Sequence, residues 1–312
     1  MKKTLMSTLL AIILIGLSAP AAFAYPNKPV SFVVPWPPGD LEDVLTRMIA
    51  DVFQEMYDVP AAVVNKPGGG GGPFPGSVGV AMAPADGTQI GSFTMAIPVV
   101  GPNVGIEALK EDTFEPIGAF LTYPFVIATK KGAPYSTMEE LAAYAKNNKV
   151  SLGHFGGKAI PTRVTKALAK TLGFQYAMDA AFDALDCNTL ASGDADVINT
   201  TLQLVLPCID DITVLASITG KRIPLTPNSP TVGEIVPELK FVLWNGLFVK
   251  KGTPQEVKDK VAAAAKKALE SPKAKKLASD TGAEVYWMEA KDTDALIESS
   301  RKGFKRLVEL NK

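Results

Sequence analysis

Short apolar runs alternate with amphipathic segments along most of this chain, and this alternation restricts its fold more than any other feature. Residues 30–35 form a short apolar run, and from Leu41 to Phe53 the apolar residues recur at the spacing of one helix face. Further strand-like runs follow at residues 61–64 and 89–93. Strands that alternate with helices are typical of a mainly parallel sheet covered by helices. The sequence therefore predicts an α/β fold.

The same alternation continues through the second half of the chain. Residues 116–128 hold apolar runs on either side of a Tyr123-Pro124 break, and the patterns predict helices at 138–146, 162–171, 254–270 and 293–310 and strands at 196–200, 212–217 and around Trp244. Residues 125–141, FVIATKKGAPYSTMEEL, also resemble residues 247–257, LFVKKGTPQEV. Two independent turns or two similarly built lobes would each explain this likeness.

The N-terminus has the pattern of a secretory signal peptide. Lys2 and Lys3 precede an apolar run at residues 9–17, and Ala22-Phe23-Ala24 follows as a cleavage site. The run is shorter than the roughly 20 residues that a membrane-spanning helix needs, so we expect cleavage after Ala24 and a periplasmic protein. The remaining 288 residues suit two compact lobes. Their 30 basic and 32 acidic residues attract neither nucleic acid nor an anionic membrane by bulk charge.

Cys187 and Cys208 are the only cysteines, and the sequence leaves open whether they form a disulfide. With one histidine in the chain, they cannot build a standard zinc site without carboxylates, and no ligand spacing indicates one. We expect no metal and no cofactor.

The turn in VVPWPPGDLEDVLTR, residues 33–47, runs from a strand into a helix and would present free N–H groups to an anion. Three acids stand there, Asp40, Glu42 and Asp43. Asp40 is interpreted as an N-cap, with Asp43 three residues on in a capping-box-like arrangement. Trp36, at the end of the strand, is the best pocket candidate among the tryptophans, whereas Trp244 and Trp287 are expected to pack in the core.

Several enzyme motifs fail on inspection. The five glycines at residues 68–72 lack the Lys-Ser or Lys-Thr of a phosphate loop, and Pro73 and Pro75 interrupt a dinucleotide fingerprint, so this segment is either a surface loop or backbone that approaches a ligand. Ser77 lies in an imperfect nucleophile elbow and would need His154 as its base. We therefore expect a protein that is not an enzyme.

Two features of the predicted second lobe have a structural and a functional interpretation. His154 lies in a Gly-rich turn, where its ring is either half-exposed or donates to an anionic ligand. Asp179, Asp183 and Asp186 would share one face of a helix, either as a solvated surface or as an acidic cleft wall.

An ordered set of motifs resembles the periplasmic receptors of tripartite tricarboxylate transporters, the Bug family. The likeness covers residues 25–312 and rests on YPNKPVSFVVPWPPGDLEDVLTR, VVNKPGGGGG, APADGTQIGS, KRIPLTPNSPTVGEI and a Trp-x-Gly-Leu-Phe-Val-x-x-Gly-Thr-Pro segment. It implies a two-lobed, Venus-flytrap fold of type II, with residues 25–124 and 225–312 in lobe 1 and residues 125–224 in lobe 2. It also implies a monomer that binds a small carboxylate between the lobes and delivers it to the subunits of a membrane transporter.

The family's ligand turns fall on identifiable residues of this chain. The resemblance implies a ligand site that includes Pro38, Gly39, Asp40, Leu41, Glu42, Asp43, Phe93, Thr94, His154, Phe155, Gly156 and Gly157, and the position of Trp36 at the end of the strand adds it to this site. The chain departs from the family pattern at Asp40, where a glycine is usual, and at Asp179, Ala180, Ala181 and Phe182, where Pro-Tyr-Lys-Gly is usual.

With that lysine lost, the alternative ligand is an amino acid or another amine-bearing molecule, whose amine would contact Asp40 or Asp183. A ligand sensor for a membrane kinase would share the same residues.

Overall fold

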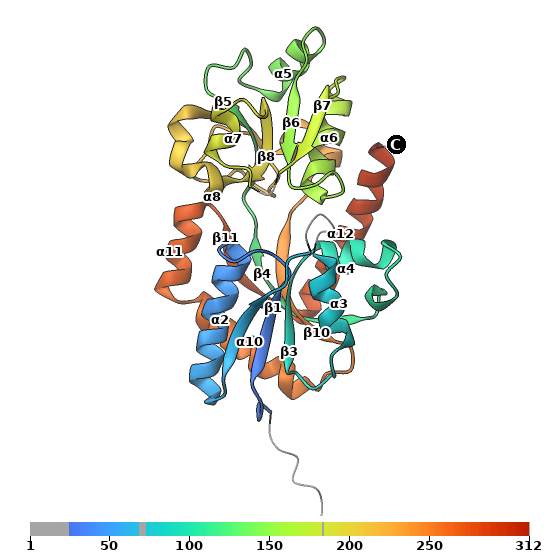
Figure 1. Cartoon of the computed structure of the whole chain (residues 1–312), viewed down its shortest axis with the longest axis vertical. Coiled ribbons are helices and arrows are strands. Elements are labelled where there is room, and N and C mark those ends of the chain that lie inside the picture. The colour runs from blue at the N-terminus through green and yellow to red at the C-terminus, as the bar shows by residue number, and fades with distance from the viewer. Residues whose placement is uncertain (1–24, 69–72, 183, 312) are drawn as a thin grey trace, which may run out of the picture.

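The computed structural model describes residues 25–68, 73–182 and 184–311. The expected signal peptide and Asp183 lie outside the described residues. The chain folds into two mixed sheets, each flanked by helices and stacked along the long axis of the molecule (Figure 1). The predicted two-lobed α/β architecture is confirmed. Within the described part of the chain, no helix is both long and apolar enough to span a membrane.

The first sheet has six strands in the order β11-β4-β10-β3-β1-β2. Its strands are β1 (Val30–Val34), β2 (Ala61–Asn65), β3 (Gln89–Thr94), β4 (Phe114–Thr122), β10 (Trp244–Lys250) and β11 (Glu284–Glu289). Strand β1 pairs in parallel with β2 and β3, whereas β10 runs antiparallel to β3 and β4. The helices that belong with this sheet are α2 (Leu41–Tyr57), α3 (Phe74–Met82), α4 (Ala96–Val100), α10 (Gln255–Leu269), α11 (Pro272–Thr281) and α12 (Ala290–Leu310).

Helix α2 forms where the apolar period predicts it. Leu41, Leu45, Ile49 and Phe53 recur every four residues and are all buried. They pack in the core between the sheet and α10, and Phe53 contacts Phe32 edge to face. The helix ends at Asp58, whose φ of 52° lies in the left-handed region. Because α2 begins directly after the turn that follows β1, its packing fixes the position of that turn.

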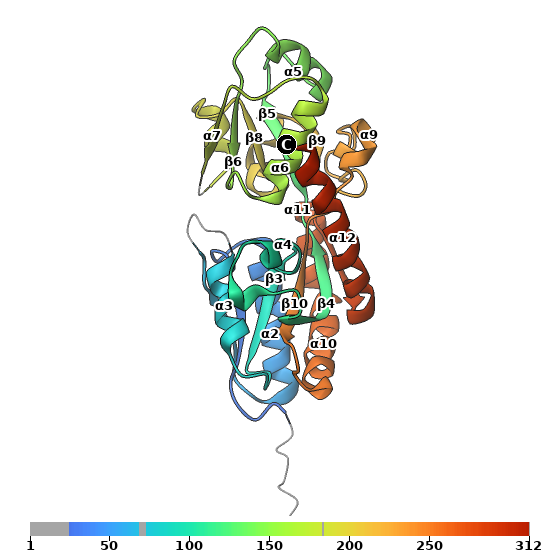
Figure 2. The same ribbon diagram turned by 90° about the vertical axis from the view of Figure 1, so that its right-hand side faces the viewer.

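The second sheet has five strands in the order β7-β6-β8-β5-β9. Its strands are β5 (Phe125–Lys130), β6 (Ser151–His154), β7 (Met178–Ala181), β8 (Val197–Thr201) and β9 (Ile212–Ser217). The associated helices are α5 (Met138–Ala145), α6 (Ile160–Thr171), α7 (Cys187–Ala191), α8 (Leu202–Val205) and α9 (Val232–Ile235). Figure 2 shows α12 rising along one side of the molecule from the first sheet toward α6.

The predicted acidic helix face in this lobe is wrong. Asp179 lies in β7, which pairs in parallel with β6, and Asp186 caps the N-terminus of α7 by accepting the Asn188 N–H at 2.9 Å. Pairing with β6 gives the backbone of this segment its hydrogen bonds, which a spacing argument along the sequence cannot take into account. The two described aspartates therefore belong to different elements.

The chain passes from the first sheet to the second at Tyr123-Pro124, between β4 and β5, and returns between β9 and β10. The two crossings lie side by side, because the Tyr123 N–H donates to the Leu243 carbonyl at 2.8 Å. Thr231 still pairs with Ser217 at the end of β9. The lobe boundaries at residues 124 and 224 stay predictions, and the contact of Thr231 favours a return somewhat later than residue 224.

The two similar segments have the same local structure. Strands β5 and β10 each lead through a turn with a left-handed glycine, Gly132 at φ 82° and Gly252 at φ 86°, into α5 and α10. In each turn the backbone N–H of the second lysine donates to the backbone carbonyl of the residue just before a neighbouring strand. Lys131 donates to Asp211, and Lys251 donates to Thr113. The likeness in sequence thus corresponds to one strand–turn–helix unit in each lobe.

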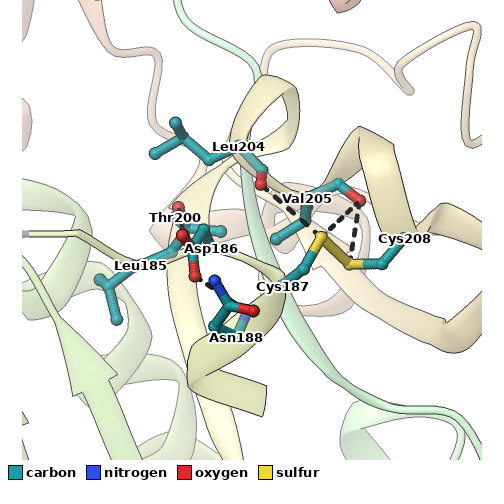
Figure 3. The surroundings of a disulfide bond; sticks show 8 residues. All are labelled: Leu185, Asp186, Cys187, Asn188, Thr200, Leu204, Val205 and Cys208. Atoms are coloured by element: carbon teal, nitrogen blue, oxygen red, sulfur yellow. Dashed lines mark hydrogen bonds between the residues drawn. A yellow bond between two sulfur atoms is a disulfide. The ribbon is translucent and has the colours of Figure 1, made fainter. Parts of the chain in front are cut away.

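Cys187 and Cys208 form a disulfide, which answers the question that the sequence left open (Figure 3). Their Cα atoms are 5.9 Å apart, and the bond joins the start of α7 to the 3-10 segment η4 (Leu206–Asp211). Both elements are short, so the bond connects segments that bury little apolar surface of their own.

Candidate functional site

The predicted first turn lies at the edge of the first sheet that is nearest the crossing. Strand β1 ends at Val34, two residues before Trp36, and β3 ends at Thr94. At the same edge β10 begins at Trp244, which pairs with Thr122 at the end of β4. Ligands of open α/β sheets bind at such an edge, outside the carboxyl ends of the parallel strands.

The predicted second turn lies at the corresponding edge of the other sheet. Strand β6 ends at His154, and the turn 154–157 leads into α6. Beside it, β8 ends at Thr201, which pairs with Phe125, the first residue after the crossing. Each turn therefore lies at the end of its sheet that adjoins the crossing strands.

Aromatic rings connect the two turns across the crossing. The rings of Tyr123 and Phe125 are 6.1 Å apart, and those of Phe125 and Phe155 are 6.5 Å apart. Burial, and next the negative charge of Glu42 in the first turn, raise the pKa of Tyr123. We call the set formed by residues 36–43, Tyr123 and residues 154–157 the candidate ligand site.

Asp43 is a structural residue of this site. Its carboxylate, only 1% exposed, accepts the Gly39 N–H at 2.9 Å, Arg47 Nη2 at 2.9 Å and Asn65 Nδ2 at 2.8 Å. Burial acts to raise the pKa of Asp43, but the hydrogen bonds from these three partners outweigh it and lower the pKa. Asp43 thereby ties the first turn to α2 and β2.

Asp40 occupies the N-cap position of α2, as predicted, but its side chain makes no capping hydrogen bond. The capping-box expectation fails in its details, because Asp43 accepts the N–H of Gly39 instead of that of Asp40. Gly39 adopts a φ of 101°, which lets the chain turn sharply at this point. The carboxyl group of Asp40 therefore forms no hydrogen bond with the N–H groups at the start of α2.

Glu42 is a nearly fully buried acid, 3% exposed, in the first turn of α2. Burial, and next the negative charge of Asp40, raise the pKa of Glu42 to about 8. Burial and the charge of Asp43 raise the pKa of Asp40 as well, and burial beside Glu42 raises that of Tyr123. Among the described residues, neither Asp40 nor Glu42 forms an ion pair with a lysine or arginine. The first turn thus holds two carboxyl groups without a cationic partner of their own.

Two helix N-termini border the site. The first hydrogen bond within α2 runs from Val44 N–H to the Asp40 carbonyl at 3.0 Å, and that within α6 runs from Arg163 N–H to the Ala159 carbonyl at 3.0 Å. Among the residues that the structure describes, no side chain caps either helix. The N–H groups before these bonds and the positive ends of the two helix dipoles favour an anion.

A chain of buried polar side chains continues from Tyr123 into the first sheet, and the sequence analysis missed it. Tyr123 donates to Asn245 Oδ1 at 3.2 Å, Asn245 Nδ2 donates to Ser92 Oγ at 2.9 Å, and the hydroxyls of Ser92 and Thr46 are 2.8 Å apart. Burying hydrogen-bonded polar groups fixes side-chain positions. In the sequence, these polar residues stand within apolar runs. The periodicity of a single strand does not show that such residues will meet one another in the fold.

Two of the predicted site residues have side chains in the core. Phe93 stacks on Phe248 at 5.8 Å and meets Phe114 at 5.1 Å, and Leu41 is 2% exposed. The side chains of Trp36, Phe155 and Thr94 are partly exposed, as is Gly156, and Pro38, Gly39 and Gly157 are exposed. The hydroxyl of Thr94 and the Nε1 of Trp36 are buried atoms without a hydrogen-bond partner among the described residues. Only the main chain of Leu41 and Phe93 remains available to a ligand.

His154 is neither half-exposed nor free to bind a ligand through its ring nitrogens. It is 2% exposed, its Nδ1 accepts the Gly156 N–H at 3.0 Å, and its Nε2 lies 2.7 Å from Asp179 Oδ1. The strand pairing of β6 with β7 buries the ring, which the sequence reading of an isolated turn did not anticipate.

The remaining motifs have structural roles. Ser77 is fully buried and donates to the Phe74 carbonyl at 2.8 Å, so it is not presented as a nucleophile. Trp244 is buried and donates to Ser300 at 3.1 Å, in agreement with its predicted packing role. Over residues 25–68, 73–182 and 184–311, no group of three His, Cys, Asp or Glu side chains could hold a metal ion.

Comparison with known proteins identifies the family. The family model described as the tripartite tricarboxylate transporter family receptor matches residues 45–311. Protein BugT of Bordetella pertussis is 26% identical over 274 residues, which cover 81% of this chain and 81% of BugT. The structure of the periplasmic binding protein BugD superimposes with a TM-score of 0.77 at 25% identity and covers 92% of this chain and 98% of BugD.

A further solved structure shows the same fold. MatC from Rhodopseudomonas palustris, with bound malate, gives a TM-score of 0.75 at 21% identity, covering 92% of this chain and all of MatC. The family match spans most of the sequence, and the two sheets agree with its fold. The chain therefore belongs to the tripartite tricarboxylate transporter receptors, the Bug family, whose members are periplasmic solute-binding proteins and not enzymes.

Proposed function

We propose that this protein captures a small organic acid between its two lobes and delivers it to the membrane subunits of a tripartite transporter. The observation that carries the proposal is the placement of two uncapped helix N-termini, those of α2 and α6, at the adjoining edges of the two sheets. Each can hold one carboxylate of a ligand that touches both lobes. Bound malate in MatC supports this ligand class.

Binding would act through closure of the lobes. The chain crosses between the sheets at Tyr123-Pro124 and near Leu243, so both lobes can turn about these adjacent segments. A ligand that contacts α2 in one lobe and α6 in the other binds the closed form more tightly than the open form, which shifts the population toward closure. The transporter would then distinguish the closed, loaded receptor from the open one.

An amino acid is a second candidate ligand. Asp40 and Glu42 have no cationic partner among the described residues, and a ligand ammonium group would provide one. In this arrangement the N-terminus of α6 would hold the carboxylate of the amino acid and the two acids its ammonium group. The negative charge of Asp40 would then disfavour a second carboxylate at the first turn.

Calorimetric titration with matched ligands tests the proposal. L-Malate and L-aspartate differ by a hydroxyl in place of an ammonium group, and 1,4-diaminobutane has no carboxylate. We expect binding of at least one of the two acids and none of the diamine. Asp40→Asn and Glu42→Gln should weaken aspartate binding if the ammonium contacts these acids, and should leave malate binding unchanged or improved. Binding of the diamine alone would refute the carboxylate proposal.

Two further measurements test whether the protein is exported and which membrane proteins it binds. Mass spectrometry of the exported protein should show a mature chain that begins at Tyr25. Pull-down with the mature protein as bait should recover membrane transporter subunits. Recovery of a membrane kinase instead would favour the sensor alternative, which uses the same ligand site.

A further inference from the structure

The sole histidine of the chain is placed where one proton can decide the shape of the second turn. His154 is the last residue of β6, and its ring folds back under the turn that it begins. Nδ1 accepts the Gly156 N–H at 3.0 Å, while Nε2 lies 2.7 Å from Asp179 Oδ1. Because an N–H group donates to Nδ1, the ring proton must be on Nε2, from which it is donated to the carboxylate.

The surroundings hold the ring in this orientation. Asp179, in the neighbouring strand β7, accepts a second bond from Lys166 Nζ of α6 at 2.8 Å. These hydrogen bonds from Lys166 and His154 lower the pKa of Asp179, so it stays ionised and keeps accepting the Nε2 proton. Asp179 directly, and Lys166 through it, are the charged groups that face His154 from β7 and α6. Lys158, in the following turn, is exposed.

The turn depends on the hydrogen bond to Nδ1. Gly156 has a φ of 136°, a conformation that only glycine adopts readily, and its carbonyl accepts the Ala159 N–H at 3.0 Å just before α6. A second proton on His154 would occupy Nδ1 and place two donors, Nδ1–H and the Gly156 N–H, face to face. The hydrogen bond that holds the turn cannot exist in that state.

We propose that His154 is a positioning residue for the second ligand turn: its neutral ring holds residues 154–157 in the binding conformation, and its protonation releases them. The importance of this role for ligand binding rests on the proposed function, because the turn adjoins the N-terminus of α6 that would hold a ligand carboxylate. Acidification then weakens ligand binding through the shape of the turn.

Nitrogen NMR of the ring tests the assignment without any ligand. Since the chain has one histidine, its ring gives a single pair of nitrogen signals. We expect the neutral ring to carry its proton on Nε2. The amide protection factor of Gly156, corrected for intrinsic exchange, should fall about fivefold to tenfold as the ring titrates, the loss that corresponds to one hydrogen bond. A ring protonated on Nδ1, or a Gly156 protection factor that does not change as the ring titrates, overturns the proposal.

Substitutions separate the positioning role from general folding. His154→Asn keeps an acceptor near the place of Nδ1 but does not titrate, so Gly156 should stay protected at every pH. His154→Phe removes the acceptor, and Gly156 protection should be low at every pH while the amides of β8 remain protected. Lys170→Met, at an exposed position in the last turn of α6, is the matched control, because it leaves Asp179, the ring and its acceptor in place. Persistence of the pH dependence in His154→Asn would refute the role of His154.

A binding experiment keeps this proposal distinct from the proposed function. Malate affinity of the full mature protein is compared at two pH values, one above and one below the ring titration that the NMR experiment measures. We expect the affinity of the wild type to fall severalfold more at the lower pH than that of His154→Asn, because the titration of Glu42 acts on both proteins alike. If the affinities of the two proteins change equally while the ring titrates, the effect on binding is wrong. If malate does not bind at either pH, the carboxylate proposal fails, whereas the NMR result still decides the role of His154.

Discussion

At the level of single residues, the three acids of the first turn have different environments despite their proximity in the sequence. Asp43 is surrounded by three hydrogen-bond donors, whereas Glu42 is buried next to Tyr123 and Asp40. The sequence identified the turn and its acids as candidate site residues, but it assigned a capping hydrogen bond to Asp40, which the structure does not show. Which acid meets Arg47 and Asn65 depends on the packing of α2 against β2, and local spacing does not contain that information.

Glu42→Gln should stabilise the protein more at alkaline than at acid pH. Because folding raises the pKa of Glu42 from its ordinary 4.5 to about 8, the folded protein binds this proton more tightly than the unfolded chain. Stability therefore falls as the pH rises from about 4.5 to about 8, by an amount on the order of a few kcal/mol. Glutamine removes this titration while keeping the size of the side chain.

Urea denaturation at pH 5 and pH 8 measures this difference. Asp51→Asn, an exposed acid on the same helix, is the control and should change little at either pH. An equal effect of Glu42→Gln at both pH values would show that Glu42 is ionised in the folded protein throughout.

Asp43→Ala should destabilise the protein by about 2–3 kcal/mol, the range for losing hydrogen bonds with a charged group. The substitution leaves the N–H of Gly39 and the amide of Asn65 without their acceptor. Since folding lowers the pKa of Asp43, its contribution is present at neutral pH and is lost as the pH falls. Urea denaturation at neutral pH checks the loss, and a change below about 0.5 kcal/mol would remove Asp43 from its structural role.

At the level of elements, the long periodic helices and most of the short apolar strands were predictable, whereas β6 and β7 were not. The spacing of α2 and α10 carries four or more apolar repeats, and both helices formed at the expected residues. Strands β6 and β7 have four residues each, and β7 is exposed along its whole length, so neither shows a two-residue alternation. They exist because β6 pairs with both β7 and β8, and these contacts join distant parts of the sequence. The position of His154 therefore became clear only in the folded chain.

The disulfide should stabilise the second lobe locally. It closes a loop with a sequence separation of 21 residues, for which the chain-entropy model gives about 3 kcal/mol. Cys187→Ala combined with Cys208→Ala should lower the stability by about that amount and should raise amide exchange first in α7 and η4. Reductant should destabilise the wild type but not the double variant. Equal stability of the two proteins would mean that α7 and η4 pack independently of the bond.

At the level of the whole molecule, the sequence predicted the architecture through the order of its motifs and the repeated strand–turn–helix unit. The two sheets and the crossing at Tyr123-Pro124 agree with that prediction. The residues that join the two halves of the site, Tyr123 and Asn245, were missed because they lie 122 positions apart and meet only where the two crossing segments run side by side. Which ligand the protein binds depends on the shape of the space between the two lobes. No single segment of the sequence specifies that shape.

The crystal structure of the protein with malate, or with the acid that binds it most tightly in the titration series, tests the central claim most directly. We predict that one ligand carboxylate lies within hydrogen-bonding distance of the N–H groups at the start of α6. A second ligand group should meet the first turn beside Asp40 and Glu42, with the two lobes closed on the ligand. A ligand bound to one lobe only, or away from both turns, would contradict the account.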